Sequence, residues 1–502
     1  MIEHLMILFF EPSLLLYLTG GMIFGMYAGA IPGISVTMAA SLIISFTFSW
    51  SPMPAIAAIL GTHIGGVYGG SRSAILLNVP GTPASIATTF DGYPLARRGE
   101  AAHALTTTAV QSVVGGIIGA LLLLLAAPLL TKFALLFAAR DYFFLSLLGI
   151  FLLSGMTGKS YSKGMFCGFL GMFLGSVGMD QMTAVKRFTF GSIELTSGLA
   201  AVAVCFGMFG IAESLNQVSD PENVKVRKQK LDRMKVNWKE TAKHLPLTIR
   251  CSLIGGIIGA LPGTGGNIAS IVAYNYAKKN VKNPEVPFGE GAIEGLVAPE
   301  SSNNAAVGGA YVPMLALGIP GDNTSAILIS ALYIHGVTPG TTLLTNSPDM
   351  YYLIIACILI GNIILLPVSL SGIKIFAKIA EVPKEVLLPL IVVLCVVGGY
   401  AINKSEFDVF VVLIAGFFGY LFKRHDFPVG SIILGLILSS LIELNLRRAL
   451  NAAFLSIPEL FLQILTSPLS LILFLAIVLL TVYQIPAVKR GMANRKAKKA
   501  RD

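Results

Sequence analysis

Apolar stretches long enough to cross a bilayer alternate with short polar segments along the whole chain. A spanning helix needs about 17–25 residues, and Val113–Leu130, Leu353–Leu370 and Leu469–Ile485 are examples of such stretches. No polar segment between these stretches is long enough to form a soluble domain of useful size. The pattern therefore predicts an all-α polytopic integral membrane protein.

Pro-Gly pairs interrupt the apolar stretches at four places. Pro lacks a backbone N–H and Gly tolerates open backbone, so each pair predicts a break in a helix. A single pair is most often a packing kink, whereas interruptions at corresponding positions of two repeats indicate a binding site. The four pairs are Pro32 with Gly33, Pro80 with Gly81, Pro262 with Gly263, and Pro320 with Gly321.

The sequence around these pairs occurs twice. GMYAGAIPGISVTMAAS around Pro32 matches GGIIGALPGTGGNIAS around Pro262 at an offset of 230 residues. GGSRSAILLNVPGTPAS around Pro80 matches GGAYVPMLALGIPGDNTS around Pro320 at an offset of 240 residues. Two matches in the same order predict two transmembrane repeats, 1–218 and 251–444.

Composition and charge agree with a membrane location. The 502 residues are 55% hydrophobic and 12% charged, where soluble domains carry about 25% charged residues. The net charge of +10 is concentrated in two basic segments, 225–250 and 489–501. Lys and Arg in this arrangement mark cytoplasmic loops, which excludes a nucleic-acid-binding role. We expect 219–250 to be a basic cytoplasmic linker and 487–502 a basic cytoplasmic tail.

The same rule predicts that the two repeats are inverted relative to each other. Met1–Ser13 lacks Lys and Arg, whereas its counterpart 219–250 is basic. Arg97 and Arg98 follow the second motif, and nothing basic lies in Gly336–Met350. Equivalent loops then lie on opposite faces, as in inverted-topology transporters. The N-terminus is placed in the periplasm; the loop with Lys186 and Arg187 disagrees with this scheme.

A cytoplasmic tail requires one extra span after the second repeat, and Leu469–Ile485 supplies it. Residues 445–486 are therefore assigned to an interfacial stretch, Asn445–Leu465, followed by the final span. Two further segments, Lys132–Asp141 and Lys374–Glu385, are expected to be short surface arms at equivalent places in the two halves.

Small polar residues gather at the breaks and form the candidate substrate and ion site. Half-helix N-termini attract anions, and C-terminal carbonyls attract cations. Each residue taken alone is more often a helix cap or an inter-helix hydrogen bond. The candidates are Ser35, Thr37, Asn78, Thr82, Ser85, Thr264, Asn267, Asn303, Asn304, Asp322, Asn323, Thr324 and Ser325.

Four ionisable residues in the apolar segments each allow two interpretations. Asp322 is a functional group within a span or the N-cap of the following helix. Glu300, in PESSNN, lies in an aqueous vestibule or a loop at the bilayer edge. Arg72 faces an anionic substrate or extends to a headgroup, and His335 is favoured as structural.

Motifs for catalysis and for resident metals are missing from the sequence. Gly158-Lys159-Ser160 resembles the end of a P-loop, but Leu153 replaces its first glycine, and there is no HExxH or GxSxG. The five cysteines fall in apolar segments without metal-ligand spacing. We expect neither an enzyme nor a cofactor. The only metal expected is a transported coupling cation, with sodium favoured over the proton because the breaks offer hydroxyls, amides and carbonyls.

Four stretches together resemble the large membrane subunit of the tripartite tricarboxylate transporters. They are AGAIPGISVTMAAS, YGGSRSAILLNVPGTPASIATTFDGYPLARRGEAAHAL, PGTGGNIASIVAYNYAKK and GEGAIEGLVAPESSNNAAVGGAYVPMLALGIPG, and the resemblance covers nearly the whole chain. It implies a permease of the bacterial inner membrane that works with a small four-span membrane subunit and a periplasmic substrate-binding protein. Thr82 departs from the Glu of many relatives, and Arg72 replaces a small polar residue.

The function that follows is import of a carboxylate by cation symport, the cargo being a tricarboxylate, a dicarboxylate or a related organic acid. By analogy with other carboxylate carriers built from inverted repeats, we expect an elevator-like motion. The alternative is a channel or a non-transporting membrane scaffold, although a channel favours rings of like charge around one pore. A membrane enzyme is a third and weaker interpretation, since it rests only on scattered acids.

Overall fold

The chain folds into two compact units. The structure is a computed structural model that describes residues 11–31, 34–156, 160–180, 182–219, 236–371 and 384–484. Unit 1 consists of Met1–Ala134 and Val202–Leu421, and unit 2 consists of Leu135–Ala201 and Phe422–Asp502. Each unit therefore contains segments of both predicted repeats.

All regular secondary structure in the described part of unit 1 is helical. Its elements are α3 (Pro12–Ala30), α4 (Val36–Thr47), α5 (Pro52–Leu77), η1 (Pro83–Ser85), α6 (Ile86–Leu95), η2 (Ala96–Glu100), α7 (Ala101–Ala134), α10 (Ala201–Cys205), η4 (Phe206–Ile211), α11 (Ala212–Ser219), α12 (Trp238–Gly259), α13 (Gly265–Asn280), α14 (Glu294–Leu317), α15 (Asn323–Ile334), α16 (Leu343–Asn346), α17 (Pro348–Ser371), α19 (Lys384–Asn403) and α20 (Glu406–Arg424), the last of which ends just past the unit boundary.

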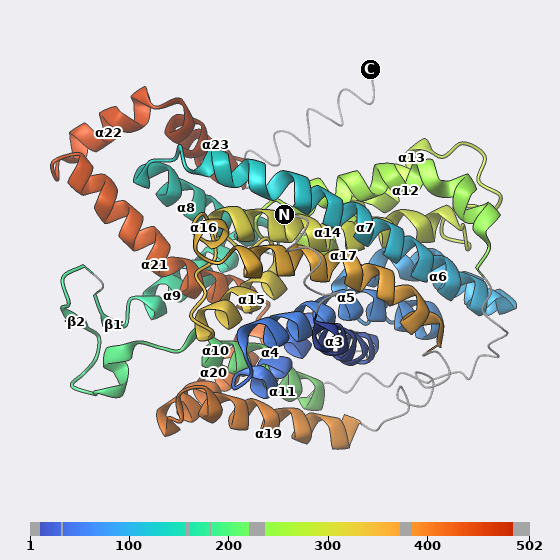
Figure 1. The fold of residues 1–502 in the computed structure, drawn as a ribbon, viewed down its shortest axis with the longest axis horizontal. Coiled ribbons are helices and arrows are strands. Elements are labelled where there is room, and N and C mark those ends of the chain that lie inside the picture. The colour runs from blue at the N-terminus through green and yellow to red at the C-terminus, as the bar shows by residue number, and fades with distance from the viewer. Residues whose placement is uncertain are drawn as a thin grey trace. The chain divides into compact units, whose positions relative to one another are not determined.

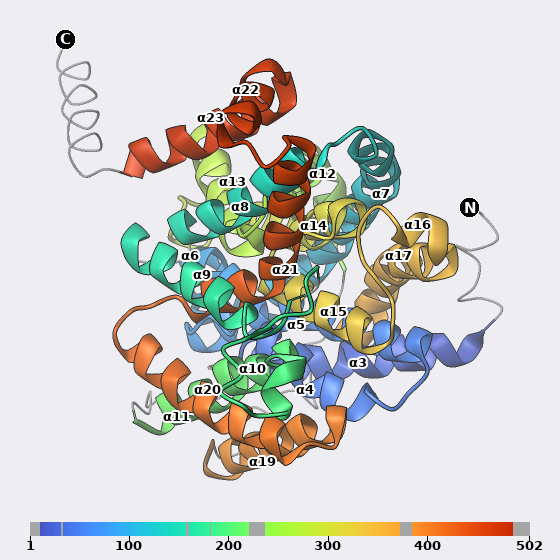
Figure 2. The same cartoon turned by 90° about the vertical axis from the view of Figure 1, so that its left-hand side faces the viewer.

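Unit 2 is built around α21. Its elements are α8 (Ala139–Met156), α9 (Tyr161–Gly175), β1 (Gly178–Met179), β2 (Lys186–Arg187), η3 (Glu194–Ser197), α21 (Val429–Ala452), α22 (Ile457–Thr466) and α23 (Pro468–Gln484). Helix α21 packs against α8 and α9, and α23 packs against α8 (Figure 2). The last turns of α21 occupy the beginning of the stretch expected at the interface, and α22 meets α23 at an angle of 100°.

Several helices have the length and composition of membrane spans, which confirms the predicted polytopic α-helical class. Among the described residues five such helical runs occur, and the bent pair α22–α23 makes a sixth if it counts as one span. The five are Pro12–Ala30, Pro83–Ala134, Ala201–Ser219, Pro348–Ser371 and Val429–Ala452. The long helices α5 and α14 are too polar to belong to this set.

Helices α5 and α14 form the centre of unit 1 (Figure 1). Helix α5 ends at Leu77 and α14 at Leu317, so the two ends match at the predicted offset of 240 residues. Helix α3 packs on α5 as α12 packs on α14, and α7 of the first repeat packs on α14 of the second. Polar helices survive at membrane depth only where other protein covers them. All 24 residues of α14 are buried.

Glycines allow α3 and α5 to approach each other closely. A Cβ atom added at Gly21 or Gly25 of α3 would overlap the backbone of α5, and one at Gly65 of α5 would overlap the backbone of α3. The second repeat has the same arrangement, because a Cβ atom at Gly255 of α12 would overlap the Ser302 backbone of α14. Small residues at helix interfaces allow this close contact in membranes. Gly25 and Gly255, which occupy equivalent positions in the duplicated motifs, therefore serve packing.

The basic loop that disagreed with the charge rule forms ion pairs with acidic residues of unit 2. Arg187 Nη1 lies 2.5 Å from Glu443 Oε1, and Arg447 Nη2 lies 2.6 Å from Asp180 Oδ2. Asp180 also accepts hydrogen bonds from the backbone amides of Met182 and Thr183. Arg187 is thus part of a local ion-pair network within unit 2, where its charge is balanced by Asp180 and Glu443.

Replacing Gly21 with Ala is expected to destabilise the protein by about 1–3 kcal/mol, because the added methyl group forces the closely packed α3 and α5 apart. Gly20→Ala is the matched control on the same helix, since nothing lies within 4 Å of a Cβ atom there. Thermal unfolding of the purified variants in detergent measures the difference. Equal melting temperatures for the two variants would contradict the proposed packing.

Candidate substrate and ion site

The two central helices end in the same way. Asn78 follows α5 with φ of 58°, and Gly318 follows α14 with φ of 73°. Both values lie in the left-handed region, which ends a helix and redirects the chain. Pro80 and Pro320 follow two residues later in each repeat and prevent the helix from continuing. The predicted breaks at these two positions are therefore helix termini.

The next helix in each repeat begins at equivalent residues. Asp322 Oδ1 accepts a hydrogen bond from the Ser325 amide at 2.7 Å, while Ser325 Oγ accepts one from the Asp322 amide at 2.9 Å. This reciprocal pair is a capping box, which satisfies backbone donors at a helix N-terminus. At the same place in the first repeat, Ser85 Oγ accepts from the Thr82 amide at 3.3 Å. The N-cap interpretation of Asp322 is thus realised.

Contacts bring the break segments together. Within the second repeat, the Gly263 amide donates to the Gly321 carbonyl oxygen at 2.7 Å. Across the repeats, the hydroxyl oxygens of Thr37 and Thr324 lie 3.5 Å apart. Helix α13 also packs against η1, which joins the break at Pro262 to the one at Pro80. Pro32 and Gly33 lie outside the described residues, but the contact of Thr37 places the start of α4 beside the same segments. We call this group of contacting break segments the break cluster.

Most candidate polar residues cap or brace these half-helices. Ser35 Oγ accepts from the Met38 amide at 3.1 Å and caps α4, and Thr264 Oγ1 donates to the Leu261 carbonyl at 2.9 Å. Asn304 Nδ2 donates to Asn303 Oδ1 at 2.6 Å. Asn78 and Asn267 are exposed, whereas Asn323 is partly buried at the start of α15. The structure therefore leaves Asn267, Asn323 and Asn78 accessible.

Thr82 differs from its neighbours because its hydroxyl group has no hydrogen-bond partner among the described residues. The residue is 3% exposed. A buried hydroxyl left without a partner is uncommon in proteins and requires an explanation. Thr82 corresponds to Asp322 in the other repeat, so both N-cap positions carry an oxygen-bearing side chain at the break cluster.

A buried His-Tyr pair adjoins Asp322 and was not anticipated from the sequence. His63 Nδ1 lies 2.6 Å from the Tyr311 hydroxyl, and His63 Nε2 lies 3.6 Å from Asp322 Oδ2. His63 comes from α5 and Tyr311 from α14, so the pair joins the two repeats. A lone histidine inside a helix carries no signal of this contact, because the partner is 248 residues away.

The other ionisable candidates lie elsewhere in unit 1. Arg72 is fully buried, and its Nη2 donates to the Ser369 carbonyl at 2.7 Å, while its guanidinium group lies over the Tyr68 ring. The expected extension of Arg72 to a headgroup is therefore wrong. Glu300 is also fully buried, so its expected position in a vestibule or edge loop is wrong. His335 ends α15, where its amide donates to the Ala331 carbonyl.

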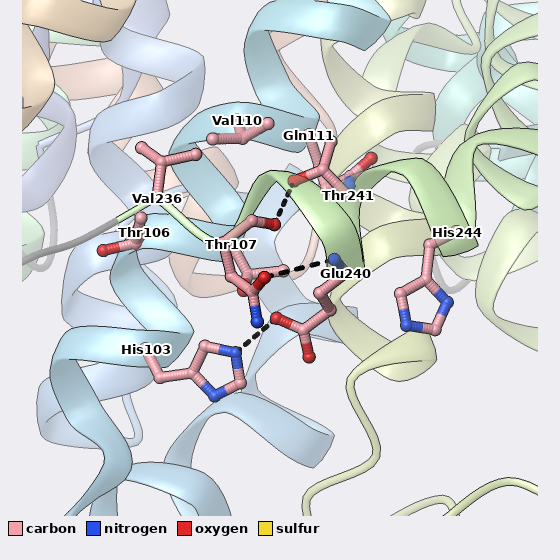
Figure 3. Close-up of a pocket in the computed structure, with 10 residues that line it drawn as sticks. His103, Thr106, Thr107, Val110, Gln111, Val236, Glu240, Thr241 and His244 are labelled. Atoms are coloured by element: carbon pink, nitrogen blue, oxygen red, sulfur yellow. Dashed lines mark hydrogen bonds and ion pairs between the residues drawn. The ribbon is translucent and has the colours of Figure 1, made fainter.

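A cavity of about 350 Å³ opens where the α6–α7 turn, α12 and the loop before α14 meet. Acidic and basic side chains share its wall. His103 Nε2 lies 2.6 Å from Glu240 Oε2, and these two residues also line the neighbouring pocket that Figure 3 shows. Lys243 lies beside this cavity, and its hydrogen bond to Glu285 lowers the pKa of the Glu285 carboxyl group. The lining residues include Arg98, Glu100, His103, Glu240, His244 and Glu294. The charge rule assigns this face to the cytoplasm, so we call the cavity the cytoplasmic vestibule.

Interrupted, duplicated helices with a shared polar cluster are typical of membrane transporters. Residues 15–434 match the model of the Tripartite tricarboxylate transporter TctA family. The chain belongs to this family, which confirms the resemblance seen in the sequence, and it is the membrane subunit of a tripartite tricarboxylate transporter. The family is one of transporters, and its tripartite composition implies two further proteins as partners.

Two relatives from Agrobacterium vitis are similar to the chain. One, described as an uncharacterized 52.8 kDa protein in the TAR-I ttuC' 3' region, is 37% identical over 430 residues, which is 86% of each chain. The other, an uncharacterized protein in the TAR-II ttuC' 3' region, is 39% identical over 196 residues, or 39% of this chain and 81% of the relative. No solved structure matches the chain.

Asp322→Ala is expected to lower the free energy of unfolding by about 1 kcal/mol, because the Ser325 amide loses its cap. Asp322→Asn keeps a capping oxygen and is expected to unfold within a few tenths of a kcal/mol of the native chain. Chemical denaturation of the two variants in detergent provides the comparison. An alanine variant as stable as the asparagine variant would show that the cap contributes nothing.

Proposed function

We propose that this chain is the translocating subunit of a binding-protein-dependent secondary transporter that imports a carboxylate by cation symport. The proposal rests on the contacts that bring break segments of both repeats together. Paired interrupted helices in inverted repeats form the substrate and ion sites of secondary transporters. The proposed cargo is a tricarboxylate, a dicarboxylate or a related organic acid.

Charge balance at the break cluster supports a coupling cation. An anionic substrate is attracted to the N-termini of α15 and of the η1–α6 run, where backbone amides point outward. Asp322 at the same place repels that substrate unless a cation is bound with it. The hydroxyl and backbone carbonyl oxygens of Thr37, Thr82 and Thr324 suit sodium, which we favour over the proton as the ion bound there.

The proposed partners are a small four-span membrane subunit and a periplasmic substrate-binding protein that delivers the carboxylate. The proposed location is the bacterial inner membrane, with the N-terminus in the periplasm and the C-terminus in the cytoplasm. This orientation rests on the distribution of Lys and Arg between the loops.

We favour an elevator-like motion in which the break segments move as one body against a frame of other helices. All four break positions belong to unit 1, and the chain passes to unit 2 after Ala134, within the expected arm Lys132–Asp141. The second expected arm, Lys374–Glu385, lies mainly outside the described residues. A change in the accessibility of Asn323 to membrane-impermeant reagents on the two sides of the membrane would accompany such a motion.

Alanine at Asn323 or Ser85 is expected to reduce uptake about tenfold or more. Asn323 offers an accessible amide at the breaks, and loss of the buried Ser85 hydroxyl removes the partner of the Thr82 amide, which costs ~1–3 kcal/mol. Uptake of radiolabelled citrate by proteoliposomes that contain all three proteins measures the effect. Asn280→Ala is the control, because Asn280 lies at the far end of α13 and bonds only to its own helix. Full uptake by the Asn323 and Ser85 variants would remove these residues from the site.

Replacing external sodium with choline is expected to abolish citrate accumulation, because the coupling ion no longer enters with the substrate. Collapsing the proton gradient alone is expected to leave the accumulation that the sodium gradient drives. Accumulation that persists without sodium and stops with the proton gradient would reverse the choice of coupling ion. Flux that neither saturates nor depends on any gradient would favour the channel alternative.

A further inference from the structure

Glu300 lies in a cage of hydroxyl groups at the centre of unit 1. Ser71 Oγ and Thr88 Oγ1 donate to Glu300 Oε1 at 2.6 and 2.5 Å, and Ser112 Oγ donates to Oε2 at 3.0 Å. The three donors come from α5, α6 and α7, so the first repeat surrounds an acid of the second. The Glu300 side chain is 0% exposed.

The cage contains no cationic partner. Among the residues that the structure describes, no Lys, Arg or His forms an ion pair with Glu300. A carboxylate buried without a countercharge costs several kcal/mol, and such a group commonly binds a proton instead of keeping its charge. The oxygen-to-oxygen distances of 2.5–3.0 Å are those of hydrogen bonds. They are short enough for a proton to be shared between the oxygens.

The hydroxyl groups suit both protonation states of Glu300. A hydroxyl group is a donor and an acceptor and can rotate. Three hydroxyls donate to the carboxylate, and one of them can turn to accept from the protonated carboxyl group. Asp91, the next acid along the α6–α14 interface, is held differently. Its Oδ1 accepts from the backbone amides of residues 289, 291 and 292, which cannot reverse their role, and its Oδ2 accepts from a single hydroxyl, that of Tyr274.

The position of Glu300 along α14 connects two regions already described. Glu294, six residues earlier and about 9 Å along the helix, lines the cytoplasmic vestibule. Asn303, three residues later and about 4.5 Å along the helix, lies with its Nδ2 3.5 Å from the Ala84 carbonyl at the break cluster. Glu300 is therefore placed between the vestibule and the proposed substrate site.

We propose that Glu300 is a proton-binding site of the translocating unit, distinct from the cation site at the breaks, that gains and loses a proton during the transport cycle. A proton from water bonds to a Glu300 carboxylate oxygen, and the same O–H bond breaks when the proton returns to water. The groups that face the carboxylate are Ser71, Thr88 and Ser112, with Asp91 the next titratable group along α6. The link to the cycle rests on the proposed function, whereas proton binding itself does not.

Infrared spectroscopy of the purified full-length protein tests proton binding without a substrate. The native chain is expected to show the C=O stretching band of a protonated carboxyl group that appears as the pH falls, and Glu300→Gln to lack it. Gln has the size of Glu and keeps hydrogen-bonding groups for the cage. Asp91→Asn is the control and should retain the band, while Thr88→Val, which removes one donor, should move its midpoint. A band that titrates identically in Glu300→Gln would overturn the proposal.

Transport assays test the link to the cycle. In proteoliposomes loaded with a pH-sensitive dye, citrate uptake by the native complex is expected to move protons, and Glu300→Gln to exchange citrate without moving them. Proton movement at the native ratio in Glu300→Gln would contradict the link. If the native complex fails to transport citrate, citrate is excluded as the cargo, and the infrared result still decides whether Glu300 binds a proton.

Discussion

A fully buried polar helix constrains the rest of unit 1. Every residue of α14 is buried, including Glu300, Asn303 and Asn304. Within a bilayer, each of these polar groups requires a protein partner, because lipid offers none. The partners of Glu300 come from α5, α6 and α7 of the other repeat, and Asn303 lies against the Ala84 carbonyl of η1, whereas Asn304 bonds within α14. The cross-repeat packing is therefore a requirement of α14, and it also places the helix ends where substrate and ions would bind.

The two repeats cover and end their central helices in the same way. Helices α5 and α14 are both covered by a glycine-containing neighbour, and both end in a left-handed residue two positions before a proline. Thr82 and Asp322 then start the next helices at the same offset. The two copies differ in charge, because one N-cap is neutral and the other is acidic. That asymmetry places an acidic side chain in one N-cap position and a neutral one in the other, and the proposed coupling cation rests on this difference.

The sequence predicted the features that depend on local chemistry. Pro-Gly pairs, apolar stretches and the duplicated motifs are local signals, so the helical class and the helix ends near Pro80 and Pro320 could be anticipated. Long-range pairing could not be anticipated, because nothing near Glu300 indicates that Ser71, Thr88 and Ser112 will surround it. The burial of polar residues could not be anticipated either, because Arg72 and Glu300 are charged residue types that lie fully in the protein interior. The pairing of Arg187 with Glu443, 256 residues away, is likewise a contact that a count of basic residues in each loop does not reveal.

The central claim is that half-helix ends from both repeats form one site, and a cross-link between Thr37 and Thr324 tests it most directly. The hydroxyl oxygens of these residues lie 3.5 Å apart and belong to different repeats. In a background with the five native cysteines replaced, the Thr37→Cys, Thr324→Cys double variant is expected to form a disulfide on mild oxidation and to release it on reduction. The Thr37→Cys, Asn280→Cys pair is the control and should remain unlinked. Failure of the first pair to cross-link, in protein that is folded and inserted, would contradict the shared site.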